Sequence, residues 1–356
     1  MRSVLIVVAG LAGIVLQSCG LPIEEKAASC TPFTPERVEA GAGCAPVYGA
    51  YCPLVTGDDA VRSRSEVIPC DGVSVETYSA SGGGYETDYL AIRGPRAPQA
   101  IYVALHYLGA ENDYFANLTR MTELAKARDV LVLVPQAPER AESLLVSVDG
   151  NLFPRWPTEP GSAGESHLQL IDGMLADARN RFGVDGVPVF AAGLSNGGPM
   201  AYFLACGRAA VFDAIEVVAG SQDATSAAQC APARAVGVVI VHGTADPVTP
   251  YAGLVGLTRT IPEIYEGFKA LGGCVGEDRL ATLRGVSEVR FQYAQPCNGG
   301  RRMVLATVVG NGHNWPGDDT GTSNGIDLGV GVFGPTIDDF DSTLQGYDLL
   351  HYAAGI

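Results

Sequence analysis

A serine flanked by glycines is the residue of this sequence best suited to attack a substrate. Residues 193–197 read Gly-Leu-Ser-Asn-Gly and fit the pattern G-x-S-x-G. In that pattern the serine lies on a tight turn from a strand into a helix, with its hydroxyl exposed above the N-terminus of the helix. The apolar run 187–192 predicts the strand, and the run 200–205 predicts the helix. We therefore expect Ser195 to be a nucleophile.

The same pattern occurs a second time, at residues 321–325, which read Gly-Thr-Ser-Asn-Gly. Acidic residues precede this match and a glycine-rich stretch follows it, so that neither a strand nor a helix frames the serine. We interpret Ser323 as a loop residue.

A serine hydroxyl attacks efficiently only when a neighbouring base, most often histidine, accepts its proton. The sequence has five histidines. His167 and His351 fall in predicted helices, whereas His106 and His242 end predicted strands. His313 follows a late strand on a glycine-bounded loop. Because the hydrolase order is serine, then acid, then histidine, we expect His313 to be the base.

The third member of such a triad is an acid that lies between the serine and the histidine in the chain. Asp246 follows a predicted strand, in the run His-Gly-Thr-Ala-Asp-Pro at 242–247. Its carboxylate would orient the imidazole and stabilise the imidazolium ion. Asp213 and Asp223 are alternatives, but they flank a different strand.

Three motifs, in this order along the chain, resemble the polyhydroxybutyrate depolymerase and feruloyl esterase family, which is similar to carbohydrate esterase family 1. They are residues 193–198 (Gly-Leu-Ser-Asn-Gly-Gly), 242–246 (His-Gly-Thr-Ala-Asp) and 312–317 (Gly-His-Asn-Trp-Pro-Gly). The resemblance covers roughly residues 85–355. It implies an exported α/β-hydrolase that cleaves carboxylic esters, of hydroxyalkanoate oligomers or of feruloyl or acetyl groups, through an acyl-enzyme and without a cofactor or metal.

The resemblance also implies two cysteine pairs. One pair follows the nucleophile helix and matches Cys206 and Cys230, and the other lies between acid and base and matches Cys274 and Cys297.

Acyl transfer places negative charge on the carbonyl oxygen, which two backbone N–H groups usually stabilise. The N–H of Asn196, at a helix N-terminus, is one expected donor. We assign the other to Tyr107, in the turn after strand 101–105, with Leu108 as the alternative. The family usually has glycine after His106, so we expect the side chain of Tyr107 to narrow this corner.

Three further side chains are expected to contact the substrate. They are His106, at the end of a strand, and the two tryptophans, Trp156 and Trp315. Core packing is an equal alternative for both tryptophans.

The elements that must position these residues alternate between strands and helices. Strand patterns cover residues 73–78, 89–93, 101–105, 130–134, 187–192, 214–219, 236–241 and 304–309, and a long loop covers 135–165. Helical spacing covers residues 112–128, 167–182, 196–206, 261–271 and 342–353. The alternation predicts a mainly parallel sheet flanked by helices, an α/β-hydrolase domain over residues 76–356.

Overall composition narrows the function classes. The net charge of −16 argues against nucleic-acid binding, and an apolar fraction of 47% is ample for a core. Several late aspartates could bind calcium, but their spacing fits no EF-hand loop, and we favour a solvated acidic loop. They are Asp318, Asp319, Asp327, Asp338, Asp339 and Asp341.

The first residues resemble an export signal. Arg2 precedes the apolar run 4–16, which is too short for a comfortable membrane span and predicts a signal peptide over 1–18. The run Leu-Gln-Ser-Cys at 16–19 resembles a bacterial lipobox, which implies cleavage before Cys19 and a lipid on its sulfur. We expect a lipoprotein of the periplasm, outer membrane or cell surface that contacts membrane only through this anchor, with an ordinary secreted protein as the alternative.

Eight cysteines remain after Cys19, and an even number outside the cytoplasm suggests four disulfides. Pairing within an early and a late group is the simplest interpretation, although spacing alone does not settle the connectivity. No C-x-x-C pair suggests zinc. The early group lies in a loop-rich segment, residues 19–75, and comprises Cys30, Cys44, Cys52 and Cys70.

Two other functions fit the same residues. A serine peptidase could use the same triad, and ester against amide substrates would distinguish it. A non-catalytic binding lipoprotein would fail to react with a fluorophosphonate probe. The oligomeric state is left open.

Overall fold

The computed structural model describes residues 30–53, 65–142, 152–157, 161–317 and 333–356 of the chain. Cys19 with the export signal, and Ser323, lie outside these residues. Within the described ranges, no helix is both long enough and apolar enough to cross a membrane.

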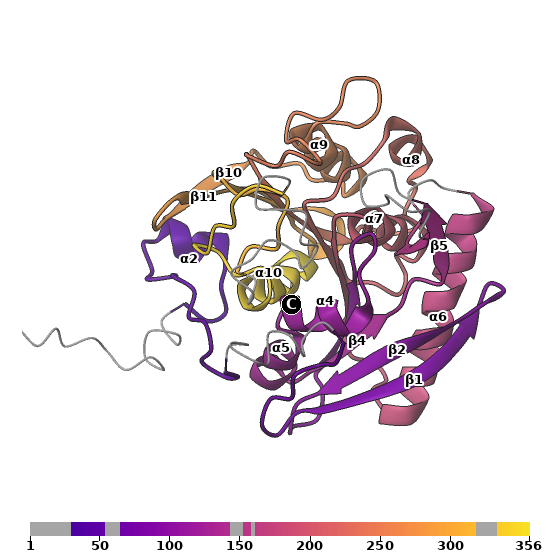
Figure 1. Ribbon diagram of the computed structural model, residues 1–356. Coiled ribbons are helices and arrows are strands. Elements are labelled where there is room, and N and C mark those ends of the chain that lie inside the picture. The colour runs from indigo at the N-terminus through magenta and orange to yellow at the C-terminus, as the bar shows by residue number, and fades with distance from the viewer. Residues whose placement is uncertain (1–29, 54–64, 143–151, 158–160, 318–332) are drawn as a thin grey trace, which may run out of the picture.

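Ten strands form one sheet in the order β1-β2-β4-β3-β7-β8-β9-β12-β11-β10 (Figure 1). The central strands pair in parallel: β4 (Val130–Pro135), β3 (Ala100–Leu105), β7 (Val189–Leu194), β8 (Ala214–Val218), β9 (Gly237–Gly243) and β12 (Met303–Val308). Antiparallel hairpins lie at the two edges: β1 (Ser74–Gly82) with β2 (Tyr85–Arg93), and β10 (Arg279–Arg284) with β11 (Glu288–Ala294). The mainly parallel sheet of the predicted α/β-hydrolase architecture is confirmed.

Helices cover both faces of the sheet. One face packs against α4 (Asn112–Leu118), α5 (Met121–Arg128) and α10 (Leu344–Ala354). The other packs against α6 (Ser162–Phe182), α7 (Gly197–Gly207) and α9 (Ile261–Leu271). Because successive side chains of a strand point to opposite faces, Tyr102 of β3 joins the first core and Val103 the second. Two covered faces explain why the central strands are apolar throughout.

Short elements complete the fold. They are α2 (Pro35–Glu39), α8 (Ala224–Gln229), the 3-10 turn η1 (Asn298–Gly300), and a small hairpin of β5 (Glu139–Glu142) and β6 (Leu152–Arg155). The hairpin lies in the region that the sequence predicted to be a loop without strands.

The prediction of a single helix over 112–128 is wrong, because the helix is interrupted at Arg120, between α4 and α5. This residue has a left-handed φ of 50° and is 3% exposed. Its guanidinium forms ion pairs with the carboxylates of Glu123 and Asp341 and donates to the carbonyl of Gly317. A buried cation needs such partners, and reaching them takes the residue out of the helix.

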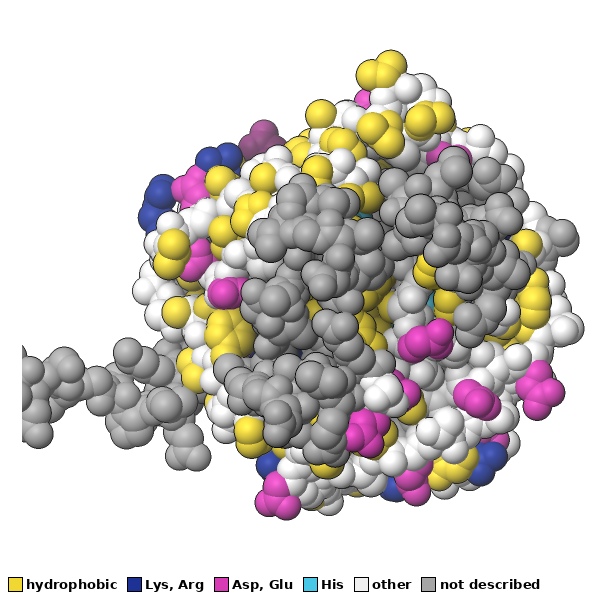
Figure 2. Space-filling view, in the orientation of Figure 1, with side chains coloured by type: hydrophobic (Ala, Val, Ile, Leu, Met, Phe, Trp, Pro, Cys, Tyr) yellow, Lys and Arg dark blue, Asp and Glu magenta, His cyan; other side chains and the backbone are white. Residues whose placement is uncertain are grey.

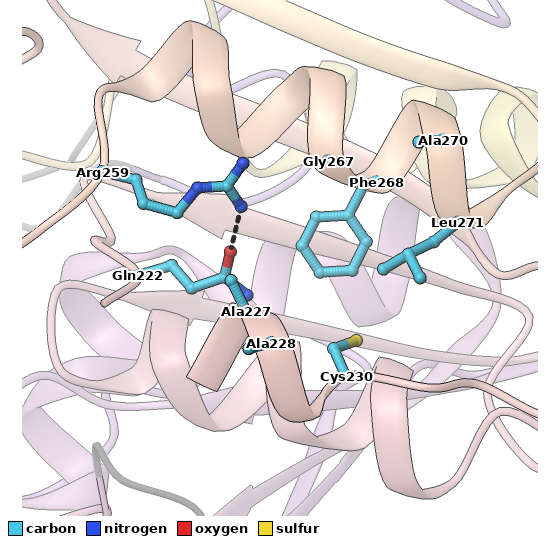
Figure 3. Close-up of a pocket in the computed structure, with 9 residues that line it drawn as sticks. All are labelled: Gln222, Ala227, Ala228, Cys230, Arg259, Gly267, Phe268, Ala270 and Leu271. Carbon is cyan, nitrogen blue, oxygen red and sulfur yellow. Dashed lines mark hydrogen bonds between the residues drawn. The ribbon is translucent and has the colours of Figure 1, made fainter. Parts of the chain in front are cut away.

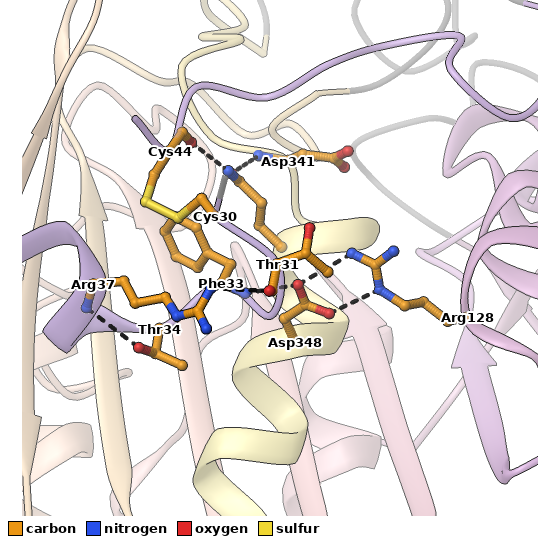
Figure 4. Close-up of a disulfide and its surroundings, with 10 residues drawn as sticks. Cys30, Thr31, Phe33, Thr34, Arg37, Cys44, Arg128, Asp341 and Asp348 are labelled. Atoms are coloured by element: carbon orange, nitrogen blue, oxygen red, sulfur yellow. Dashed lines mark hydrogen bonds and ion pairs between the residues drawn. A yellow bond between two sulfur atoms is a disulfide. The ribbon is translucent and has the colours of Figure 1, made fainter. Parts of the chain in front are cut away.

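The N-terminal cysteine-rich segment packs into the core of the hydrolase fold (Figure 4). Next to the Cys30–Cys44 disulfide, Phe33 is 1% exposed and its ring centroid lies 5.6 Å from that of Phe291. The backbone N–H of Phe33 donates to the carboxylate of Asp348 on α10, which also accepts from Arg128. This segment therefore stabilises the sheet directly.

Four disulfides pair cysteines within the early and the late group, as expected. They are Cys30–Cys44, Cys52–Cys70, Cys206–Cys230 and Cys274–Cys297. The last two are the pairs that the family resemblance implies. Cys206–Cys230 ties the end of α7 to the end of α8.

Candidate active site

Ser195 lies on the turn between β7 and α7, at the carboxyl end of the sheet. Its φ of 53° is left-handed, which is rare for a residue with a side chain and typical of a strained nucleophile turn. Its N–H donates to the carbonyl of Val218 on β8. The glycines of the motif have no room for a side chain: a Cβ on Gly193 would lie 2.1 Å from the carbonyl oxygen of Gly197, and one on Gly197 would lie 2.2 Å from that of Leu105.

His313 follows β12 and reaches back to the serine. Its Nε2 lies 2.7 Å from Ser195 Oγ, and its Nδ1 lies 2.8 Å from an oxygen of Asp246. The backbone N–H of His313 donates to the carbonyl of Phe333, and a Cβ on Gly312 would lie 2.1 Å from that same carbonyl oxygen. Glycine before the histidine therefore lets the two segments pack closely enough to hold the ring.

Asp246 lies on the turn after β9 and is 5% exposed. One carboxylate oxygen accepts from the N–H groups of Val248 and Thr249, both at 2.8 Å. The other lies 2.8 Å from His313 Nδ1, 2.9 Å from Thr249 Oγ1 and 3.3 Å from His242 Nε2. Burial acts to raise the pKa of Asp246, but the hydrogen bonds and charges of His242 and His313 outweigh it and hold this pKa well below its usual range. The carboxylate is therefore ionised.

Thr249 connects the acid to the neighbouring strand, a role that the sequence analysis missed. Its hydroxyl lies 2.9 Å from the carbonyl oxygen of Ala219, just after β8, as well as 2.9 Å from the Asp246 carboxylate. Its own carbonyl lies 2.7 Å from His242 Nε2. A threonine three residues after an aspartate is typical of a turn closed by side-chain hydrogen bonds, which is the signal that could have identified it.

Asn196 contributes two different groups beside the serine. Its backbone N–H, at the start of α7, makes no hydrogen bond to any residue that the structure describes. Its side chain forms a reciprocal pair with the backbone of Trp156: the amide oxygen accepts from the N–H at 2.7 Å, and the amide nitrogen donates to the carbonyl at 3.0 Å. No sequence motif indicates this second contact.

The segment around Trp156 joins the nucleophile turn to the turn after β3. The indole N–H of Trp156 donates to the carbonyl of His106 at 3.0 Å, and the N–H of Gly109 donates to the carbonyl of Pro154 at 2.9 Å. The turn that carries Tyr107 is thereby held next to Ser195. That Tyr107 supplies the second N–H donor stays a prediction.

The side chain of Tyr107 does not extend this turn into open space. It is 7% exposed and belongs to the core, where its ring meets that of Phe115 edge-on at 6.3 Å. We expected this side chain to narrow the room for an acyl group, but it packs in the core instead.

The expectation that His106 contacts substrate is wrong, because the ring is fully buried and both nitrogens are engaged. Nε2 accepts from the N–H of Ala137 at 2.9 Å, and Nδ1 lies 2.8 Å from the carbonyl oxygen of Tyr107. Burial lowers the pKa of His106 to about 4. It is a neutral structural histidine.

Both tryptophans are also fully buried in the core, which was the alternative considered for them. The indole N–H of Trp315 donates to the hydroxyl of Thr343 at 3.0 Å, and the indole N–H of Trp156 donates to the backbone carbonyl of His106. Their indoles offer no exposed surface to a substrate.

The late aspartates within the described ranges serve the fold. Asp339 accepts from the N–H groups of Val286 and Ser287, and Asp341 pairs with Arg120. No group of three or more His, Cys, Asp or Glu side chains in the described part of the chain could hold a metal ion. Asp318, Asp319 and Asp327 lie outside it.

Residues 89–264 match the family model described as "Esterase PHB depolymerase". The chain is 27% identical over 176 residues to feruloyl esterase B of Piromyces equi, a match that takes in 46% of this chain and 32% of that relative. It is 31% identical over 166 residues to feruloyl esterase C of Emericella nidulans, covering 46% of this chain and 52% of the relative. The matches thus span about a third to a half of the relatives' own lengths.

Among solved structures, an acetyl xylan esterase from Aspergillus awamori is similar at 15% identity and a TM-score of 0.47, over 65% of this chain and 92% of that one. A similarity at this level says nothing about the reaction.

Proposed function

This chain belongs to a polyhydroxybutyrate depolymerase and feruloyl esterase-like family, and from that membership we propose that it hydrolyses carboxylic esters, with Ser195 as nucleophile, His313 as base and Asp246 as acid. The observation that carries the proposal is the hydrogen-bonded line from Ser195 Oγ through the imidazole to the carboxylate, with distances of 2.7 and 2.8 Å. Such a line lets the imidazole accept the serine proton while the ionised carboxylate stabilises the imidazolium ion.

In the first half of the reaction, Ser195 Oγ forms a bond to the ester carbonyl carbon as Nε2 of His313 takes the hydroxyl proton. The carbonyl oxygen becomes negative and accepts hydrogen bonds from the N–H of Asn196 and from a second donor, assigned to Tyr107. The bond to the alcohol oxygen then breaks, and His313 passes its proton to the departing alcohol. An acyl-enzyme on Ser195 remains.

In the second half, water attacks the acyl carbon and gives a proton to His313. The bond to Ser195 Oγ breaks, the serine recovers the proton, and a carboxylic acid leaves. Every step uses side chains and backbone groups of this chain, so the proposal needs no cofactor.

The proposed substrates are esters of hydroxyalkanoate oligomers or of feruloyl or acetyl groups. Four disulfides indicate an oxidising compartment, so we place the protein outside the cytoplasm. Attachment to a membrane through a lipid on Cys19 remains part of the proposal.

A substrate panel tests this function. Purified protein is assayed on acetyl, feruloyl and hydroxybutyrate-oligomer esters and on the matching amides. We expect ester hydrolysis that Ser195→Ala lowers by about 10³–10⁶-fold, because the nucleophile is removed. Ser323→Ala, which alters the second G-x-S-x-G match, is the control and should keep the parent rate.

Equal rates in Ser195→Ala and the parent would rule out Ser195 as nucleophile. Amide hydrolysis faster than ester hydrolysis would indicate a peptidase, and inactivity on the whole panel would favour a binding lipoprotein.

A further inference from the structure

A groove of about 460 Å³ lies between α8 and α9, outside the Ser195–His313–Asp246 line (Figure 3). Its volume is within the range of about 300–1,000 Å³ that is usual for small-molecule sites. Ala227 and Ala228 of α8 form one wall, and Phe268 and Leu271 of α9 form the other. The Cys206–Cys230 disulfide fixes the end of α8 beside them. The walls of the groove therefore suit a narrow apolar chain.

One end of the groove carries hydrogen-bond donors. Arg259, just before α9, donates from Nη1 to the amide oxygen of Gln222 at 3.1 Å and from Nη2 to the carbonyl of Glu263. A Cβ on Gly267 would lie 2.8 Å from Nη1. The glycine therefore leaves room for the guanidinium to lie across the first turns of the helix, facing α8.

The guanidinium of Arg259 has no ion-pair partner in the described part of the chain. A guanidinium has five N–H donors, and both hydrogen bonds of Arg259 go to uncharged oxygens. No ion pair joins Arg259 to a described carboxylate; its charge acts only in part on the exposed Glu263 carboxyl, whose pKa is lowered first by hydrogen bonds to Thr260 and then by Arg259. A half-buried cation in a protein of net charge −16 ordinarily finds such a partner.

Gln222 adds a second donor at the same end. Its side chain is 5% exposed, and its amide oxygen is taken by Arg259. The amide nitrogen makes no hydrogen bond to a described residue. This nitrogen is not among the enclosed atoms that lack a partner, so guanidinium and amide together present hydrogen-bond donors to the open groove.

The surroundings of this end are apolar and adjoin the candidate active site. Gln222 follows Ala219 by three residues, and the carbonyl of Ala219 is bonded to Thr249 of the acid turn. The loop that leads to Arg259 exposes Val255 and Leu257, at 104% and 69%. Figure 2 shows hydrophobic side chains at the top of the view, in the region of α9 and α8 in Figure 1.

We infer that the groove binds an aliphatic monocarboxylate. The carboxylate accepts from Arg259 and Gln222, and the alkyl chain lies between the two alanines of α8 and the side chains of Phe268 and Leu271. Two planar donors and a charge suit a carboxylate, because a guanidinium and a carboxylate match in geometry. The inference does not depend on the proposed esterase activity, although ester hydrolysis would release ligands of this class nearby.

Isothermal titration of the purified protein with decanoate, octanoate and decanol tests the site. Decanoate should bind about tenfold more tightly than octanoate, since two buried methylenes contribute about 0.8 kcal/mol each. Decanol lacks the charge, and its affinity should be lower than that of decanoate by about tenfold or more. No binding of decanoate, or equal binding of decanoate and decanol, would overturn the inference.

Two variants assign the binding to this groove. Arg259→Gln should weaken decanoate by about tenfold or more and leave decanol unchanged, because only the charged head loses a partner. Arg179→Gln removes the same charge from the last turn of α6 and should leave both affinities at the parent level. Equal effects of the two variants on decanoate would show a general charge effect and contradict the site.

A third variant, Leu271→Ser, should flatten the dependence on chain length without abolishing the preference for a carboxylate. Melting temperature and acetyl-ester hydrolysis serve as fold controls for all variants. Binding is read directly, so a protein without esterase activity would still give a clear result.

Discussion

Two buried carboxyl groups of the same sheet, one in the turn after a strand and one within a strand, differ in their hydrogen-bond partners. Asp246, on the turn after β9, is 5% exposed, and hydrogen-bond donors meet both of its oxygens. Glu216, within β8, is fully buried, and neither oxygen has a hydrogen-bond partner among the described residues. A Cβ on Gly346 of α10 would lie 2.4 Å from one of these oxygens, so the glycine accommodates the carboxyl.

The difference teaches that hydrogen bonds, not burial alone, decide whether these groups carry a charge. Burial and the negative charge of Asp341 raise the pKa of Glu216 well above its usual value. Around Asp246 the donors and the two histidines outweigh burial and lower the pKa. The turn after β9 thus keeps a charge where a triad uses one, and β8 holds a neutral acid in the core.

The largest expected effect comes from replacing each of the two acids by its amide. Asp246→Asn should lower kcat/KM for an acetyl ester by about 10⁴-fold, since an amide no longer favours the productive histidine tautomer. Glu216→Gln, the matched change in the core, should leave kcat/KM within about twofold of the parent, because a neutral acid is replaced by a neutral amide. Comparable losses in the two variants would break the comparison.

A smaller effect should follow when Asp246 loses one donor. Thr249→Val removes the hydroxyl that lies between the carboxylate and the carbonyl of Ala219. We expect kcat to fall about tenfold, the equivalent of one hydrogen bond, with KM nearly unchanged. Thr225→Val, at an exposed position on α8, is the control. An unaltered kcat in Thr249→Val would mean that the two backbone N–H groups hold the acid unaided.

The smallest effect concerns stability and its dependence on pH. Because the pKa of Glu216 is raised in the folded protein, the unfolded chain binds fewer protons above its own pKa of about 4.3, and the parent loses stability as pH rises from there towards the folded pKa. Glu216→Gln removes this pH-dependent loss of stability. Its melting temperature, measured by calorimetry, should therefore gain on the parent between pH 4 and pH 8. A constant difference across that range would show that Glu216 is not kept neutral.

The central strands could be predicted, and Ser195, Asp246 and His313 could be proposed as a triad, because local patterns carry them. The central strands are apolar throughout, since both faces are covered, and helix 261–271 begins at a capping box of Thr260 and Glu263. The break at Arg120 could not be predicted, because its ion partner Asp341 lies far along the chain. Strand β11, which lies between β12 and the edge strand β10, was not predicted, because charged side chains alternate with its apolar ones and leave a weak pattern.

The candidate site likewise has residues that the sequence predicted and contacts that it did not. Glycine spacing and chain order pointed to Ser195, His313 and Asp246, which the structure brings within hydrogen-bond distance of one another. The side chains of Asn196 and Thr249 bond to backbone groups that are remote in sequence, and no motif encodes those partners. Residue type also misled for the tryptophans, because an indole in the core and one in a pocket look alike in a sequence.

The most direct test of the proposed triad is covalent labelling with a fluorophosphonate, followed by mass spectrometry of the digested protein. The account predicts one adduct, on Ser195, which is absent in Ser195→Ala and forms more slowly in Asp246→Asn because the base is no longer held in its productive tautomer. An adduct on Ser323, or no adduct on the folded parent protein, would contradict it.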